Sequence, residues 1–430
     1  MLGWEFPPFI SGGLGTACYG LTKSMSKLGL EIIFVLPRSV GMDMQTTHVR
    51  MRTPADIDLP DRQKLERELK NVKFRTITSP LQPYASAENY KQQVEELIRA
   101  KQKRYGSTST ESSGSGFQHY CGDMYAEVHK YAAAAVTLAI QESFDIIHAH
   151  DWMTYPAGMA VAAVTGKPLV VHVHSTEFDR SGENVNQMIY DIERAGMHAA
   201  DKVIAVSYLT RNIIIGRYGV SSDKVEVVYN GVERNGNGLG LGTTGIKKDE
   251  KIVLFLGRIT MQKGPEYFLG AAKKVLEVMD DVKFVMAGSG DMMRKTIELA
   301  AELGIGSKVL FTGFLRGEDV RKVYEMADLY VMPSVSEPFG IAPLEALNHD
   351  VPVLISKQSG VSEVLTHVLK ADFWDVNEIA NKIVAVLKYP PLQMTLREHG
   401  NFEVRKLKWE DAAQKCQQIY NQLLSSAVCV

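Results

Sequence analysis

The segment KIVLFLGRITMQKGPEYFLGAAKKVLEVM (residues 251–279) contains a strand, a loop and a helix in succession. Its first seven residues, KIVLFLG, form a near-continuous apolar run, which is typical of a strand covered on both faces of a sheet. From Glu266 the apolar residues take helical spacing, in EYFLGAAKKVLEVM (266–279). Such a unit predicts a parallel sheet covered by helices.

This alternation continues through almost the whole chain. A second helical segment is RKTIELAAELG (294–304), and KWEDAAQKCQQIYNQLLSS (408–426) is a third, which we expect to pack across a domain junction. The strands are predicted at 31–37, 144–150, 168–174, 202–207, 224–230, 251–257, 282–288, 308–313, 327–334 and 351–356. The series predicts an α/β protein built from doubly wound, Rossmann-like sheets.

At 430 residues the chain is too long for one ordinary core, so two domains are expected. The segment 230–250 is rich in Gly, Asn and Thr without apolar period, and it marks the boundary. We predict an N-terminal Rossmann-like domain at 1–232, a linker at 233–250, a C-terminal Rossmann-like domain at 251–407 and a C-terminal helix at 408–430.

Two parts of the first half are less regular. Residues 40–125 carry no confident strand pattern, and YGSTSTESSGSG (105–116) within them is predicted to be a loop. Only Met1 to Trp4 precede the first turn, so either the first strand is very short or the natural start lies upstream.

Composition and charge exclude several classes of protein. The chain is 45% hydrophobic and 23% charged with a formal net charge of -2, which gives no reason to expect nucleic acid or an acidic membrane as a partner. The four cysteines are scattered without a CxxC pair, as expected of reduced thiols. Apolar runs are too short for a membrane span and no signal peptide is evident, so we expect a cytoplasmic protein; oligomeric state is left open.

Several strand ends carry polar groups suited to a ligand. In SGGLG (11–15), Gly13 and Gly15 stand before a helix, either as an anion-binding loop or as an ordinary tight turn. In LGRITMQKG (256–264), Arg258 and Lys263 follow a parallel strand, where open α/β sheets bind ligands. They are suited to a diphosphate, or they are solvated surface cations.

Histidines mark two further strand ends, in HAHDW (148–152) and HVHS (172–175). We expect His148 and His172 to point into packing, and His150 and His174 to be the site candidates. Neither pair has a third ligand at metal-binding spacing, so no metal site is predicted.

Two carboxylates, Glu337 and Glu345, stand in the otherwise apolar segment SEPFGIAPLEALNHDVPVLIS (336–356). Eight residues of helix span about 12 Å, whereas acid/base partners in glycoside hydrolysis lie roughly 5–9.5 Å apart. A bend before the helix leaves a pair open, but two separate roles are favoured, each carboxylate accepting hydrogen bonds from vicinal hydroxyls.

Taken together and in this order, GGLG, HxHDW, GRxxxxKG and E-x7-E with its PFG core resemble retaining glycosyltransferases of the GT-B fold. The resemblance is strongest to glycosyltransferase family 4 and the glycogen and starch synthases. It covers nearly the whole chain. Two departures, Ile10 in place of the synthases' lysine and EPFG in place of EPCG, favour family 4.

The resemblance implies roles for individual residues. Arg258 and Lys263 would hold the diphosphate of a sugar-nucleotide donor, Glu337 the hydroxyls of the sugar, and His150 would stand at the reacting face of the sugar. The remaining donor contacts would be Gly13, Gly15, His174, Gly313, Phe314, Phe339, Gly340 and Glu345, with Glu345 at the ribose and Gly313–Phe314 at the base. Such enzymes need no cofactor or metal, and Asp56-Ile57-Asp58 is considered incidental.

The expected function is transfer of a hexosyl unit, glucosyl by preference, from a nucleotide diphosphate sugar to a carbohydrate acceptor, an α-glucan among the candidates. A family 4 transferase with a non-glucan acceptor, and a nucleotide-sugar epimerase of the same fold, stay open as alternatives. A non-catalytic carbohydrate- or nucleotide-binding protein is a third.

Overall fold

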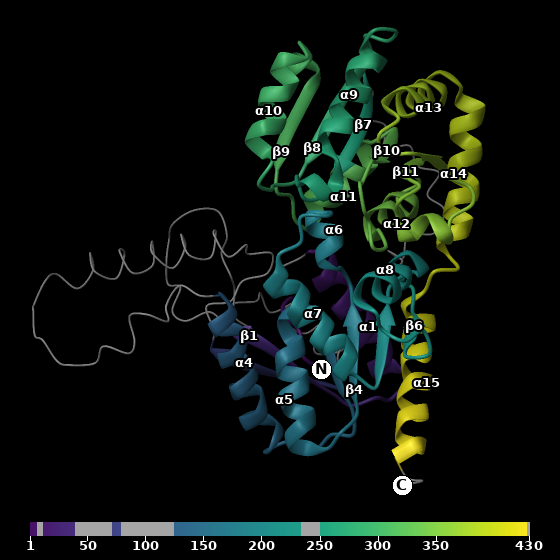
Figure 1. The fold of residues 1–430 in the computed structure, drawn as a ribbon. Helices are drawn as coiled ribbons and strands as arrows, with labels where there is room; N and C mark the ends of the chain where they lie inside the picture. Colours follow the sequence, from purple (N-terminus) through teal and green to yellow (C-terminus); the bar gives the residue numbers. More distant parts are fainter. Residues whose placement is uncertain (7–11, 39–70, 79–123, 234–249, 428–430) are drawn as a thin grey trace, which may run out of the picture. The chain divides into compact units, whose positions relative to one another are not determined.

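The computed structural model describes residues 1–6, 12–38, 71–78, 124–233 and 250–427 (Figure 1). The expected linker core, the 105–116 loop and Asp56-Ile57-Asp58 lie outside these residues. The chain divides into two compact units. The first unit comprises Met1–His172, Ile192–Val203 and Gln418–Val430, and the second comprises Val173–Asp191 and Ile204–Gln417. The domain boundaries expected from the sequence stay a prediction.

The second unit contains a six-stranded sheet in the order β12-β11-β10-β7-β8-β9, in which every paired neighbour is parallel. Counted from β7, this is the Rossmann order 3-2-1-4-5-6. The direction of winding therefore reverses between β7 and β10. The strands are β7 (Lys251–Leu256), β8 (Val282–Ala287), β9 (Val309–Gly313), β10 (Leu329–Met332), β11 (Val353–Ser356) and β12 (Leu369–Ala371).

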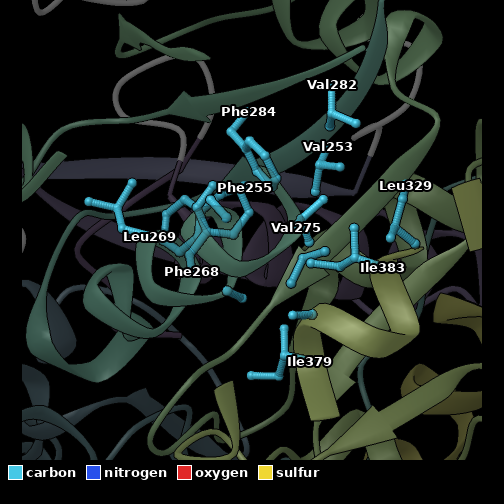
Figure 2. Close-up of a cluster of buried hydrophobic side chains, with 14 of the residues drawn as sticks. Val253, Phe255, Phe268, Leu269, Val275, Val282, Phe284, Leu329, Ile379 and Ile383 are labelled. Carbon is cyan, nitrogen blue, oxygen red and sulfur yellow. The ribbon is translucent and has the colours of Figure 1, made fainter. Parts of the chain in front are cut away.

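Helices cover both faces of this sheet because alternate strand residues on each face are apolar. Val253 and Phe255 belong to one buried cluster, shown in Figure 2, and Leu254 between them belongs to another. In the first cluster the ring of Phe268 lies 5.5 Å from that of Phe255 and 5.7 Å from that of Phe284. The helices are α9 (Pro265–Leu276), α10 (Met293–Glu302), α11 (Glu318–Met326), α12 (Ile341–Asn348), α13 (Val376–Lys388), α14 (Pro390–Val404) and α15 (Trp409–Ala427), of which α15 is divided between the two units after Gln417.

Backbone hydrogen bonds join the loops at the carboxyl edge of the sheet. Gly257 N–H donates to Ala287 O at 3.0 Å, and Gly288 N–H donates to Gly313 O at 2.8 Å, which links the ends of β7, β8 and β9. On the other side, Val335 N–H donates to Gln262 O at 2.9 Å. The loops after β7 and β10 are therefore fixed to each other where the sheet reverses its winding.

The first unit is built around parallel strands as well. Leu2 forms parallel bridges to both Val35 and Ala149, so residues 1–3 take the place of a strand between β1 and β3. Its strands are β1 (Ile32–Arg38), β2 (Val72–Thr78), β3 (Ile147–His150) and β4 (Leu169–Val173). The four-stranded sheet β3-β4-β5-β6 also includes β5 (Lys202–Ala205) and β6 (Val225–Val227), of which β6 belongs to the residues of the second unit.

The helices of this half of the chain follow the strands as expected. Their bounds are α1 (Gly13–Lys27), α4 (Met124–Ala139), α5 (Tyr155–Thr165), α6 (Glu177–Ser181), α7 (Gln187–Ala199) and α8 (Tyr208–Tyr218). All ten predicted strands are present, although several are shorter than predicted. The sequence missed β2, which falls in the irregular region, and the three-residue β12. The predicted fold class, two Rossmann-like α/β domains, is confirmed.

Candidate functional site

An ion pair between Lys263 and Glu337 lies at the carboxyl edge of the second unit's sheet. The ammonium of Lys263 donates to Oε2 of Glu337, and their side chains are 20% and 8% exposed. Lys263 follows β7 and Glu337 follows β10, the two neighbouring strands between which the winding reverses. Ligands of open α/β sheets bind at this position. The sequence named both residues but did not predict their contact.

Local backbone structure holds Lys263 in place. It ends a 3-10 turn, η3 (Met261–Lys263), and Gly264 follows with a φ of +63°, in the left-handed region that favours glycine. A side chain at Gly264 would also meet the carbonyl oxygen of Pro333, 2.3 Å from its Cβ position. Pro265 then begins α9, where the absent N–H costs nothing.

The backbone of Glu337 is fixed to a different segment. Its N–H donates to Gln358 O at 2.9 Å, and its carbonyl accepts from Gly360 N–H at 2.9 Å. The hydroxyl of Ser334 lies 3.4 Å from Oε2 of Glu337. Glu337 is therefore held as a buried carboxylate beside a cation, the condition under which a buried charge is tolerated.

Arg258, the second predicted cation, lies earlier in the same loop. Its Nη2 donates to Oε1 of Gln262 at 3.1 Å, and Gln262 is itself buried. The structure thus places both predicted cations after β7, with Lys263 in contact with Glu337 and Arg258 in contact with Gln262.

The second predicted carboxylate, Glu345, has a different partner. It is half-buried on α12, and its Oε2 accepts a hydrogen bond from the hydroxyl of Tyr324 at 3.1 Å. Burial raises the pKa of Glu345, although Tyr324 and His349 oppose that shift. Glu337 therefore pairs with Lys263 and Glu345 with Tyr324, and the two separate roles stay a prediction.

The turn between these carboxylates depends on Gly340. Gly340 stands just before α12 with a φ of +107°, which a side chain adopts only with strain. Phe339 before it is buried, and its carbonyl accepts from Val361 N–H at 2.7 Å. The predicted helix start near Gly340 is confirmed.

Gly313 and Phe314 lie at the end of β9, on the same edge of the sheet. Gly313 has a φ of +72°, and the Phe314 side chain is 50% exposed with the guanidinium of Arg316 5.1 Å from its ring centre. An exposed aromatic ring at this edge suits stacking on a base. The role at the base stays a prediction.

A short segment before α7 also belongs to the second unit. His174 is half-buried, and burial lowers its pKa to about 3, so its ring is neutral at pH 7. Asp179 on α6 is buried and accepts a hydrogen bond from the Ser336 hydroxyl at 2.5 Å. Burial raises the pKa of Asp179, against the effect of its donors. The sequence analysis did not single out Asp179 or Ser336; the only local signal was the T-x-x-D capping pattern at 176–179.

The glycine-rich segment takes a form that differs from the one expected. The helix α1 begins at Gly13, so Gly13 and Gly15 lie in its first turn rather than in a preceding loop. The N–H of Gly15 donates to Oε2 of Glu5 at 2.9 Å, and Glu5 is fully buried. A carboxylate of the chain itself therefore lies at this helix N-terminus.

His150 lies with His148 and His172 in a stack of buried imidazole rings in the first unit. His148 Nε2 and His172 Nδ1 lie 3.2 Å apart, and His148 Nδ1 and the Tyr420 hydroxyl lie 2.5 Å apart. The three rings have nitrogen atoms within 4.8 Å of one another. Their planes differ by 17–29°. The structure thus brings together three ring nitrogens that the sequence spacing did not suggest as a set. From the sequence we expected His150 to be a site residue, unlike His148 and His172, but its side chain is fully buried as well.

Two Rossmann-like units built on parallel strands are the arrangement of the GT-B fold. Residues 242–401 match the family described as glycosyl transferases group 1, and residues 121–235 match glycosyltransferase family 4. Together with the 30% identical glycosyltransferase described next, these matches show that the chain belongs to the glycosyltransferases.

Individual relatives agree with this assignment. An uncharacterised glycosyltransferase of Methanocaldococcus jannaschii is 30% identical over 379 residues, which cover 85% of this chain and 82% of the relative. Alpha-maltose-1-phosphate synthase of Mycolicibacterium smegmatis is 32% identical over 248 residues, 52% of this chain and 62% of that enzyme. Anabaena HepE, solved with UDP and glucose, is 17% identical with a TM-score of 0.67 over 98% of both chains, a likeness of fold.

Among the helices that the structure describes, none combines the length and the apolar character required to cross a membrane.

Proposed function

We propose that this glycosyltransferase moves a glucosyl unit from a nucleoside diphosphate glucose to a carbohydrate acceptor, with retention of anomeric configuration. The observation that carries the proposal is the contact between Lys263 and Glu337. In this contact a cation suited to a diphosphate lies directly beside a carboxylate suited to sugar hydroxyls. The sugar and the diphosphate of a donor are bonded to each other, so the groups that bind them must also be neighbours.

In this proposal the chain acts through positioning and charge. The bond between the anomeric carbon and the diphosphate oxygen breaks, and its electron pair leaves with the diphosphate. Lys263 and Arg258 stabilise that growing negative charge, and Glu337 orients the sugar through its hydroxyls. The acceptor oxygen bonds to the same face of the anomeric carbon, and its proton passes to the departing phosphate.

The other predicted residues complete the donor site. Glu345 accepts the ribose hydroxyls, and Phe314 stacks beside the base. His174 is proposed to line the sugar, a role that rests on the family resemblance. The donor supplies all the chemistry, so no cofactor is included.

The acceptor has two candidates. An α-glucan is one, supported by the family resemblance to glycogen and starch synthases. A phosphorylated sugar or polyol is the other, and it is supported by relatives named alpha-maltose-1-phosphate synthase and D-inositol 3-phosphate glycosyltransferase. An epimerase of the same fold would convert the donor without any acceptor.

The test is release of nucleoside diphosphate from UDP-glucose, ADP-glucose and GDP-mannose. Each donor is assayed alone, with a malto-oligosaccharide, with glucose 1-phosphate and with inositol 3-phosphate. Release from a glucose donor that depends on one acceptor supports the proposal and identifies the acceptor class, and NMR of the product tests retention. Acceptor-independent formation of a new sugar nucleotide would instead establish an epimerase. No turnover of any donor would contradict the proposal.

The contribution of Lys263 is tested by Lys263→Ala. We expect kcat to fall by about 10² or more with the fold intact, because a preorganised charge at the leaving group is lost. Lys283→Ala is the matched control, since that exposed lysine on β8 binds Ser307 O at 2.8 Å and lies outside the proposed site. Near-normal kcat for Lys263→Ala would refute the assignment of the diphosphate to this residue.

A further inference from the structure

The loop that carries Glu337 is held by three successive residues, each bonded to a different part of the chain. Val335 binds Gln262 through the backbone, Ser336 binds Asp179 through its side chain, and Glu337 binds Gln358 through the backbone. The first of these bonds lies beside Lys263 and the third lies behind Glu337. The bond from Ser336 to Asp179 spans 157 positions in the sequence and is the only side-chain contact of the three.

The two carboxylate oxygens of Asp179 accept hydrogen bonds from different parts of the chain. Its Oδ2 accepts from the backbone N–H of Thr176 at 2.7 Å and from the Thr176 hydroxyl at 2.8 Å, which completes the capping box of α6. Capping a five-residue helix uses only this oxygen. The other oxygen, Oδ1, accepts from Ser336. Because Asp179 is only 2% exposed, its carboxylate depends on these donors.

We propose that Asp179 is a positioning residue for the Lys263–Glu337 pair. By accepting from Ser336 it fixes the residue next to Glu337, and so keeps the Glu337 carboxylate at Lys263, where the sugar is oriented against the diphosphate. Asp179 touches neither substrate. This inference rests on the proposed function, because it assigns to Asp179 a share in the geometry of that same site.

The consequence is specific to the sugar. A nucleoside diphosphate without sugar engages Lys263 but has no hydroxyls for Glu337, so its affinity should not depend on Asp179. Turnover of the sugar nucleotide should depend on it, because small displacements of orienting groups cost large factors in rate.

Variants of the full-length chain separate this role from helix capping. Ser336→Ala removes only the bond to Asp179, and Thr176→Val removes only the hydroxyl of the cap. Asp179→Ala removes both contacts. Asp179→Asn retains a side chain that caps the helix and bonds to Ser336. Ser425→Ala, an exposed serine on α15 whose hydroxyl bonds to Asn421 O, is the general control.

The measurements are donor kcat/KM and binding of the matching nucleoside diphosphate, with the donor that the release assay identifies. We expect Ser336→Ala to lower kcat/KM roughly tenfold, the range of one hydrogen bond to a charged group, with nucleoside diphosphate affinity within about twofold of wild type. Asp179→Ala should lose at least as much, the double variant no more than Asp179→Ala, and Asp179→Asn should recover part of the activity. Thr176→Val should stay near wild type.

The proposal would be overturned by unchanged kcat/KM in Ser336→Ala, or by equal losses of sugar-nucleotide turnover and nucleoside diphosphate affinity. Independent effects of Ser336→Ala and Asp179→Ala in the double variant would also overturn it. Should Asp179→Ala fail to fold, Ser336→Ala alone decides. Failure of the proposed function itself is distinct, because then the wild-type chain shows no donor turnover.

Discussion

Substituting Gly264 by alanine should disturb both stability and catalysis, and the structure sets the size of each effect. Gly264 has a φ of +63°, and the added Cβ would lie 2.3 Å from the carbonyl oxygen of Pro333. Ordinary contact begins near 3.4 Å, so the loops after β7 and β10 must separate by about 1.1 Å. The residues just beyond this contact are Lys263 on one side and Ser334 on the other.

The left-handed backbone alone costs an alanine about 1–2 kcal/mol, and relieving an overpacked contact typically adds about 1–3 kcal/mol. Gly264→Ala should therefore lower the free energy of unfolding by about 2–5 kcal/mol. Its effect on the chemical step follows from the displacement of Lys263 from Glu337, since a shift of this size costs on the order of 10²-fold in rate.

Gly304→Ala is the matched control in the same unit. Gly304 has a similar φ of +70° after α10, but its Cβ position meets no atom within 4 Å. It should show the backbone cost of about 1–2 kcal/mol with full kcat per folded molecule.

The assays are chemical denaturation for stability and donor turnover for catalysis. The difference between the two variants isolates the contact with Pro333. Equal stabilities and equal kcat in the two variants would refute the reasoning, because the close approach of the two loops would then have no energetic consequence.

Three further predictions concern other parts of the second unit. Phe268→Ala should lose about 3–5 kcal/mol in urea denaturation, because the ring is fully buried between two others; a loss below 1 kcal/mol would contradict this core. Burial opposes the charge of Glu403, yet the backbone and ring of His367 hold its pKa below its usual value. Glu403→Gln should therefore have a lower melting temperature than wild type at pH 7, and the difference should shrink as the pH falls through the lowered pKa of the wild-type carboxyl; a difference independent of pH would contradict this. Tyr324→Phe removes a donor that lowers the pKa of Glu345, so the rise in donor KM on acidification should begin at higher pH than in wild type; superimposable KM profiles would exclude that role.

Much of the fold follows from local patterns. Near-continuous apolar runs such as 251–257 are strands because a parallel sheet covered on both faces buries every side chain. The prediction missed two strands whose local pattern is weak: β2 lies within the irregular region, and β12 has only three residues. Residues 1–3 take the place of a strand through pairing with β1 and β3, which no local periodicity encodes.

The sequence allowed us to predict candidate site residues but not which of them are in contact. Positions such as Lys263 and Glu337 were found because polar groups after parallel strands gather at one edge. Which groups then meet depends on strand order, and the order becomes known only when the sheet is assembled. The contact of Ser336 with Asp179 and that of His148 with Tyr420 join positions 157 and 272 apart. The sequence around these four residues does not indicate either contact.

The two acids in the apolar segment 336–356 show how burial and partnering combine. A carboxylate removed from water needs a cation or hydrogen-bond donors, and the seven residues between the two acids have no side chain that could supply one. Each acid therefore finds its partner elsewhere, Glu337 in Lys263 from the loop after β7 and Glu345 in Tyr324 from α11. Gly340, with its φ of +107°, bends the chain between them so that the two carboxylates serve different partners. In the proposed mechanism this separation is required by the donor. One carboxylate orients the sugar and the other holds the nucleoside, and the bond that breaks lies between these two parts.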